Sequence, residues 1–237
     1  IDAPAQSAPK PKAKTISTPP PTSHKIKGYR GSGTANDPLM ISNLNELMGL
    51  QRPEIGQQGY HFRQTADIDG SAMDTWQDII FQGTYDGAGH TITYRSNETR
   101  ALFKCINKNS NIHSLRLQHL SLACEVQGST ITCCQSNTFL VQQTVRQSQI
   151  SDCVVCFDGD TNHYFYNGPR YTNQDNHMGA ISRLLDENST LERCLVYGNI
   201  QSVSQQNNDY DARLSGMVAA CCNSTIRQSV LGALTIP

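Results

Sequence analysis

The residues best suited to chemistry gather in one stretch, FDGDTNHYFYNGPRYTNQDNHMG at positions 157–179. Aromatic rings beside amide, acid and imidazole groups suit the recognition of a sugar or a protein surface. The alternative is a lateral loop whose aromatic rings only cover the side of the fold. The candidate ligand-binding residues are His163, Tyr164, Phe165, Tyr166, Tyr171 and His177.

The same stretch begins with the spacing of a calcium-binding loop. Asp158, Asp160 and Asn162 alternate as the first ligands of such a loop do. His163, however, occupies the position that needs Gly, and no Glu follows at the twelfth place. We therefore expect no cofactor, and we keep these three residues as the candidate ligands for Ca²⁺.

Cysteine could also carry chemistry, because the chain has nine cysteines and one CxxC, Cys153-Val-Val-Cys156. That spacing binds zinc or cycles between redox states when it lies on a helix or knuckle. In a strand, residues three apart face opposite sides, and no second CxxC follows. We expect Cys153 to be a small buried core residue. A disulfide to a neighbouring turn of the fold, such as Cys153 to Cys194, is geometrically plausible.

The segment FQGTYDGAGHTITY (81–94) places Asp86 close to His90, as an active site would. Its glycines favour another interpretation. Gly87 and Gly89 suit a tight turn with positive φ or close backbone approach, and the Asp86 carboxylate can cap that turn. We expect a structural turn, followed by a strand with Ile92 facing inward.

Signatures of the common enzyme classes are missing. The sequence has no His-Glu-x-x-His, no Gly-x-Ser-x-Gly and no phosphate-binding loop. A carbohydrate-active enzyme stays an alternative, because such enzymes use clustered acids beside a basic residue. The acids would be Asp152, Asp158 and Asp160, with Arg183 or Arg193.

The elements that position these residues are predicted by a repeat. Four segments superimpose: NIHSLRL, QISDCVV, TLERCLV and TIRQSVL. Their second residues are Ile112, Ile150, Leu191 and Ile226, at intervals of 38, 41 and 35 residues. A bend must follow each of these, and a short strand with two inward residues follows the bend.

Each repeat is preceded by an apolar cluster and a polar Asn- or Ser-containing turn, without helical periodicity. Repeats of this length indicate stacked architecture, and short strands with corner turns indicate a β-solenoid. Two excursions interrupt the repeat, at 157–178 and 202–215. Equivalent loops stack in a solenoid, so we expect them to lie beside each other.

The repeats resemble the GLUG (Gly-Leu-x-Gly) family of bacterial surface proteins, in GAISRLLDENSTLERCLVYGNIQS and GMVAACCNSTIRQSVLGALTI. Residues 31–50 resemble the opening segment of solenoids in IgA-specific metallopeptidases, and residues 60–94 resemble their first coil. The second Gly of the motif is missing here. The resemblance implies an all-β, right-handed parallel β-helix, often found in adhesins or exported multi-domain proteins.

The two ends of the expected domain, residues 28–237, differ. Residues 1–27 carry six prolines and several lysines, which indicates a semi-rigid linker. In ISNLNELMGL, Ser42 or Asn43 can cap a short helix with Glu46 in its first turn, and we expect that helix to cover the open end of the solenoid. The chain ends at VLGALTIP in mid-coil, so either it continues or a partner covers the edge.

The missing enzyme signatures favour a non-catalytic module, and the resemblance implies that it is exported to the bacterial cell surface or outside the cell, as an adhesin-like binder or a structural stalk. The alternatives are a carbohydrate-active enzyme and a structural subunit of a secretion or surface assembly, joined through the C-terminal edge or the Pro-rich tether. The ligand would be a protein or glycan. A net charge of −1 argues against nucleic acid, and no apolar run is long enough to span a membrane.

Overall fold

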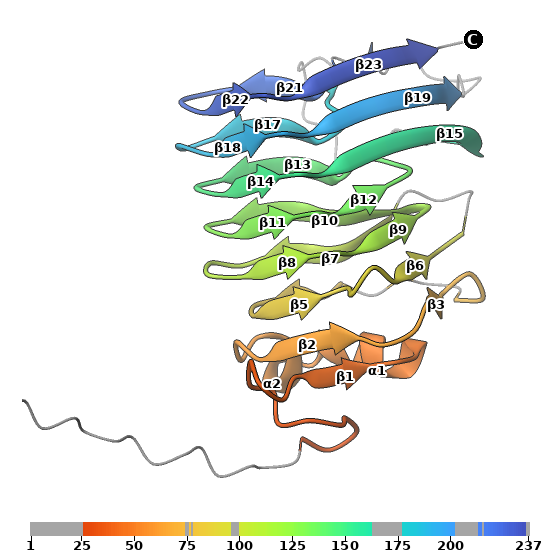
Figure 1. Cartoon of the computed structure of the whole chain (residues 1–237), viewed down its shortest axis with the longest axis vertical. Helices are drawn as coiled ribbons and strands as arrows, with labels where there is room; N and C mark the ends of the chain where they lie inside the picture. Colours follow the sequence, from red (N-terminus) through yellow and green to blue (C-terminus); the bar gives the residue numbers. More distant parts are fainter. Residues whose placement is uncertain are drawn as a thin grey trace, which may run out of the picture.

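The computed structural model describes residues 26–73, 76, 78–95, 100–162, 177–201, 213–214 and 216–235. Most of the proposed linker and the centres of both excursions lie outside these residues. The described strands form a right-handed parallel β-helix, in which three parallel sheets stack along one axis (Figure 1).

The first sheet has eight short strands that pair in parallel. It contains β1 (Leu39–Ile41), β2 (His61–Gln64), β5 (Thr84–Asp86), β8 (Asn111–His113), β11 (Thr130–Thr132), β14 (Gln149–Ser151), β18 (Thr190–Glu192) and β22 (Thr225–Arg227).

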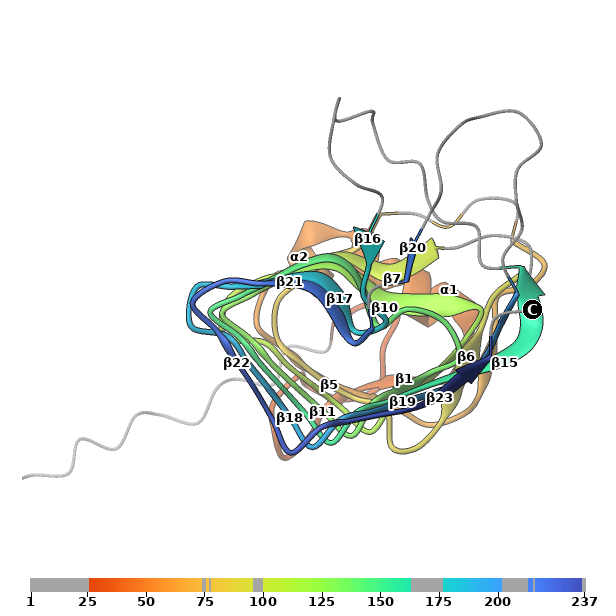
Figure 2. The same ribbon diagram turned by 90° about the horizontal axis from the view of Figure 1, so that it is seen from above.

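The other two large sheets complete each coil. The second sheet contains β3 (Ile68–Asp69), β6 (Thr91–Thr93), β9 (Arg116–Gln118), β12 (Gln135–Ser136), β15 (Val154–Asn162), β19 (Leu195–Gln201) and β23 (Val230–Thr235). The third sheet contains β4 (Ile80–Phe81), β7 (Arg100–Ile106), β10 (Leu120–Gln127), β13 (Val141–Arg146), β17 (Ser182–Asp186) and β21 (Val218–Cys221). A separate pair, β16 (His177–Met178) with β20 (Arg213–Leu214), lies outside the coils (Figure 2).

The repeat predicted from sequence is confirmed, with one correction. Ile150 pairs with Leu191 and Leu191 with Ile226, so the aliphatic residues of successive coils lie one above another. Between Ile112 and Ile150, however, the structure inserts a coil that contains Ile131. The 38-residue interval is therefore two coils of 19 residues, and the sequence interpretation missed β11 and β12.

The predicted bend after each aliphatic residue is a single residue with left-handed backbone. Its φ lies between 50° and 56° in every coil from β8 onward. The residues are Ser114, Cys133, Asp152, Arg193 and Gln228. L-amino acids adopt this conformation at a cost, so the stacked coils on either side must hold it.

A column of buried serines joins the coils at the opposite corner of the first sheet. The backbone N–H of Ser129 donates to Ser148 Oγ at 3.1 Å, Ser148 N–H to Ser189 Oγ at 3.2 Å, and Ser189 N–H to Ser224 Oγ at 3.1 Å. Each hydroxyl oxygen thus accepts a hydrogen bond from the backbone N–H of the serine in the preceding coil. Because buried N–H groups need partners, this column stabilises the stacking where the chain leaves the third sheet.

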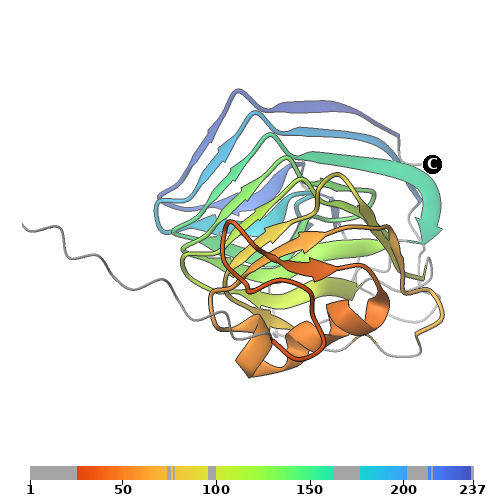
Figure 3. The same cartoon turned by 60° about the horizontal axis from the view of Figure 1, so that its bottom comes forward.

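The N-terminal end of the solenoid is covered by the predicted helix and two short turns (Figure 3). These are α1 (Leu44–Met48), a 3₁₀ turn (Gly49–Gln51) and α2 (Pro53–Gly56). Asn43 is the N-cap, since its Oδ1 accepts the Glu46 N–H at 3.0 Å. Leu47 and Leu50 are fully buried on the first coil. Such a cover protects the end of the core from solvent.

The last described coil lacks such a cover in the part of the chain that the structure describes. Leu191 and Val196 are fully buried, whereas their counterparts one coil later, Ile226 and Leu231, are 43% and 49% exposed. The backbone edges of β21, β22 and β23 also face away from the stack. Apolar side chains and unpaired strand edges therefore occur together at this end.

Candidate functional site

The two excursions leave the solenoid side by side, as expected from their equivalent positions. β15 and β19 pair from Val154↔Leu195 to Asn162↔Gln201 before the excursions begin. Where the chain returns, β16 pairs with β20 through His177↔Arg213 and Met178↔Leu214. We call these paired ends the loop feet. Of these loop feet, β15 and β19 belong to the second sheet, and β16 and β20 lie outside the three large sheets (Figure 2).

The aromatic candidates belong to the first excursion but lie outside the described residues. This holds for His163, Tyr164, Phe165, Tyr166 and Tyr171. His177 lies in β16, at the loop feet. The structure therefore places the attachment points of the candidate ligand site together, and the role of its aromatic residues stays a prediction.

The calcium candidates lie on β15, where the first excursion starts. Asp158 is exposed, and its Oδ2 accepts a hydrogen bond from Asn137 Nδ2 at 2.7 Å. Asp160 and Asn162 occupy the last positions of the strand. No group of three His, Cys, Asp or Glu side chains that could hold a metal occurs among the described residues. The assignment of Asp158, Asp160 and Asn162 to Ca²⁺ stays a prediction.

Asp152 and Asp158, two of the acids considered for catalysis, lie far apart. Asp152 lies at the corner before β15, and the four steps of strand from Val154 to Asp158 cover about 13 Å. Asp152 is also bound by Arg193, whose Nε and Nη2 donate to its two oxygens at 2.7 and 2.8 Å. The hydrogen bonds from Arg193 hold the pKa of the Asp152 carboxyl below its usual range. A general acid would need the opposite shift.

The Asp152–Arg193 pair belongs to a chain of ion pairs that crosses three coils. Arg193 also contacts the Glu192 carboxylate, and Arg227 Nη2 lies 2.8 Å from Glu192 Oε2. Charges of both signs alternate along this corner, so they neutralise each other and order the side chains. The arrangement is that of a structural network on the surface.

Asp86 and His90 have the structural roles expected of the Gly-rich turn. Asp86 Oδ1 accepts the Ala88 N–H at 2.8 Å, and Gly89 has φ +79°. A Cβ on Gly87 would lie 2.5 Å from the Leu115 Cα, so close backbone approach requires Gly there. His90 Nδ1 lies 3.2 Å from Asp67 Oδ1, so its partner is Asp67 and not Asp86. Ile92 is fully buried, as predicted.

The thiols of the CxxC behave as predicted for a strand. Cys153 is fully buried and Cys156 is half-buried, and all nine cysteines are free, so the disulfide considered between Cys153 and Cys194 is not formed. Cys134, in the coil that the sequence interpretation missed, extends the column to three buried thiols. Each donates to the carbonyl oxygen two residues earlier, at 3.2 to 3.4 Å. These are core contacts, which do not activate a nucleophile.

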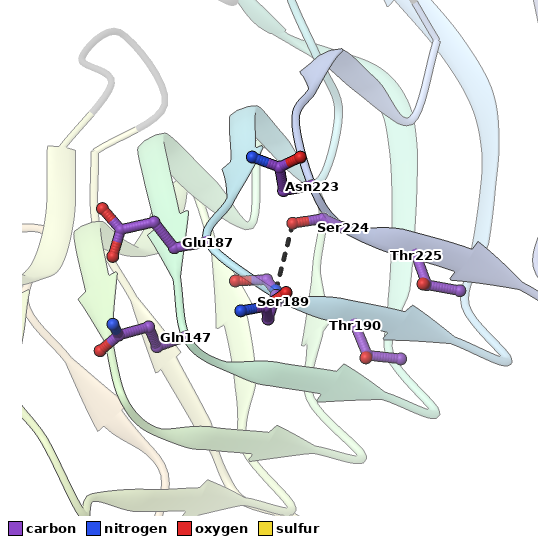
Figure 4. Close-up of a pocket in the computed structure, with 8 residues that line it drawn as sticks. Gln147, Glu187, Ser189, Thr190, Asn223, Ser224 and Thr225 are labelled. Atoms are coloured by element: carbon purple, nitrogen blue, oxygen red, sulfur yellow. Dashed lines mark hydrogen bonds between the residues drawn. The ribbon is translucent and has the colours of Figure 1, made fainter.

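One polar groove was not predicted from the sequence (Figure 4). It lies at the turns between the third and first sheets and has a volume of about 650 Å³. The turn at Glu187 and Asn188 has two residues with positive φ, whereas the turns of the adjacent coils have one each, Gln147 and Asn223. The longer turn contributes to the groove, whose lining is Gln147, Glu187, Asn188, Ser189, Thr190, Asn223, Ser224 and Thr225.

The fold defines the class of protein, which is a parallel β-helix. Comparisons with known proteins do not assign the chain to a family within that class. No family model matches the chain, so membership of the GLUG family stays a prediction. The chain is 32% identical over 113 residues to halomucin of Haloquadratum walsbyi (strain DSM 16790 / HBSQ001). This match covers 40% of the chain and 1% of the length of halomucin.

Among solved structures, the chain is similar to one from Bacteroides ovatus described as a candidate immunoglobulin A1 protease. The TM-score is 0.49 at 15% sequence identity, over 85% of this chain and 79% of that one. In the described residues, no helix is both long and apolar enough to cross a membrane.

Proposed function

We propose that the chain is a non-catalytic β-helix module of an exported surface protein, and that it binds a protein or glycan ligand through its paired excursions. The observation that carries this proposal is the pairing of β16 with β20 at the loop feet. It brings the ends of two excursions from successive coils together on a rigid scaffold. Loops positioned in this way commonly carry binding function.

Two side-chain contacts favour a binder over an enzyme, and one comparison bears on location. Asp152 is neutralised by Arg193, and Asp158 is bonded to Asn137, so neither acid has a free partner for proton transfer. The partial match to halomucin, together with the resemblance to GLUG repeats, supports an extracellular or cell-surface location. A stalk is the simplest additional role, because a solenoid extends in one direction as coils are added.

The test removes the excursions and leaves the coils. One variant replaces residues 163–176 with a short Gly-Ser turn, and a second replaces residues 203–211 in the same way. Arrays of glycans and of extracellular-matrix proteins report binding, and polysaccharide lyase and hydrolase assays report turnover. The proposal requires a ligand whose binding both variants lose while their thermal unfolding is retained. Turnover of any polysaccharide by the full chain would refute it in favour of the enzyme.

A second role, as a structural subunit of a larger assembly, is favoured by the last coil. Among the described residues, Ile226, Val230 and Leu231 are 43%, 57% and 49% exposed there, next to the edges of strands that have one neighbour within that part of the chain. Surfaces of this kind commonly contact another protein. Charged substitutions at Ile226 and Leu231 would abolish assembly and leave ligand binding through the excursions unchanged, which separates the two roles.

A further inference from the structure

The outward face of the first sheet carries a continuous row of uncharged hydrogen-bonding side chains. Each strand of this sheet from β5 to β22 contributes the residue that precedes its central, inward-facing residue. The strands pair in register, so these residues follow the solenoid axis at about 4.8 Å per coil and span about 24 Å. This polar row consists of Thr84, Asn111, Thr130, Gln149, Thr190 and Thr225.

The polar row differs from the other outward row on the same strands. In that second row Asp86 lies 3.6 Å from Arg63 and 3.3 Å from His113, and Glu192 is held by Arg227. Side chains of the polar row make no hydrogen bond to any part of the chain that the structure describes. One row is thus occupied by ion pairs, while the other leaves its donors and acceptors available.

The polar groove is an independent feature that joins the row at its C-terminal end. Thr190 and Thr225 belong to both, and in Figure 4 both lie beside the groove, below and to the right of Asn223. Glu187 is the charged residue of the lining, and Arg146 Nε lies 3.9 Å from its carboxylate. The groove therefore adds amide and hydroxyl groups in a concave setting to the end of a flat row.

The chemistry of the two features defines the class of ligand. It must be extended, because the row is long and straight, and it must present donors and acceptors at a regular spacing. An uncharged ligand fits best, since the row has no charged member and the nearby carboxylates are already paired, Glu187 with Arg146 and Glu192 with Arg227. The row has no apolar or aromatic member, so a peptide segment that needs apolar pockets would gain little there.

We propose that the polar row and the polar groove bind a neutral, linear polysaccharide that lies along the solenoid axis. This surface is separate from the paired excursions, and the inference does not depend on their function. Each neutral hydrogen bond contributes little net free energy, because it replaces one to water. Affinity must therefore increase with the number of sugar units until the chain spans the row.

The experiment titrates the full chain with neutral cello-, xylo- and manno-oligosaccharides of two to eight units, by calorimetry and NMR. Thr130→Val with Thr190→Val removes two hydroxyls from the row and keeps β-branched shape. Thr132→Val is the matched control, because Thr132 lies two residues from Thr130 on the same strand but in the second row. Thermal unfolding establishes that all variants are folded.

The expected result is affinity that increases with length in one oligosaccharide series, a loss of about tenfold in the double variant, and no change in Thr132→Val. Absence of binding in all three series would overturn the proposal, as would equal losses in the double variant and the control. Tighter binding of polygalacturonate than of the neutral chains would overturn the ligand class.

The variant without residues 163–176 separates this proposal from the function proposed above. Binding of the oligosaccharide must persist in that variant. If binding is lost there and retained in Thr130→Val with Thr190→Val, the glycan binds to the excursions and the row is not its site.

Discussion

The serine column offers the sharpest test of what holds the coils together, through the substitution Ser148→Ala. Ser148 is 2% exposed, and its Oγ accepts the Ser129 N–H at 3.1 Å while donating to the Arg146 carbonyl oxygen at 2.5 Å. Alanine removes the acceptor without adding volume. The Ser129 N–H then stays buried without a partner, which costs about 1–3 kcal/mol. For a chain of this size, about 2 kcal/mol lowers Tm by about 4–8 °C.

Two measurements check this expectation. Circular dichroism gives Tm for the whole domain, and hydrogen exchange monitored by NMR gives the protection of the Ser129 amide. Ser151→Ala is the control, because Ser151 lies on the next strand with its side chain directed outward, where the change costs less than about 0.5 kcal/mol. Unchanged exchange at Ser129 in Ser148→Ala would show that the hydroxyl does not hold the coils, and the reasoning would be refuted.

Three other substitutions or treatments test the turns, the ion pairs and the thiols. Gly198→Ala should lower the free energy of unfolding in urea by about 3 kcal/mol or more, because φ is +116° and the new Cβ would lie 2.0 Å from the Phe157 carbonyl oxygen. Gly59→Ala is the control: a Cβ there would meet no atom within 4 Å, so the free energy of unfolding should fall by only about 1–2 kcal/mol. Asp152→Asn should lower Tm near neutral pH, because Arg193 depresses the pKa of Asp152 and the stabilisation is complete above the unfolded value of about 4. The difference in Tm between the variant and the wild type should shrink as pH falls below about 4 and through the lower folded value, and a difference that stays constant as pH falls would contradict this. An aromatic disulfide reagent should modify exposed Cys133 in the native protein, and buried Cys134 only after unfolding. Peptide mass mapping measures both reactions, and equal rates at the two positions would disprove the assigned inward and outward directions of these side chains.

The stacked core was predictable because inward residues repeat with the period of a strand. Ile150, Leu191 and Ile226 have the same neighbours in sequence and occupy the same position in successive coils. The coil around Ile131 was missed because TITCCQS has only one large aliphatic residue, Ile131. The position two residues after Cys134, which holds an aliphatic residue in the other coils, is here occupied by the buried Ser136. A hydrogen bond from Ser136 Oγ to the Leu120 carbonyl oxygen makes that polar residue acceptable in the core.

The candidate site was predictable only in outline. Equivalent excursions in stacked coils must start close together, and this logic anticipated the pairing of β16 with β20. The groove was not anticipated, because it depends on one extra left-handed residue, Asn188 beside Glu187, and a turn lengthened by one residue has no periodic signal in sequence. The polar row needed the coil of Ile131 in place before its members could be aligned.

The 19-residue spacing from Ile112 to Ile131 and on to Ile150 has a mechanical consequence. Tension applied between the ends of the domain would act on one terminal coil at a time, since each coil is bonded only to its two neighbours. Release of a 19-residue coil lengthens the chain by about 60 Å. The longer coils between Ile150 and Ile226 would give larger steps, so the force–extension trace of a single molecule would record the order in which the solenoid unwinds.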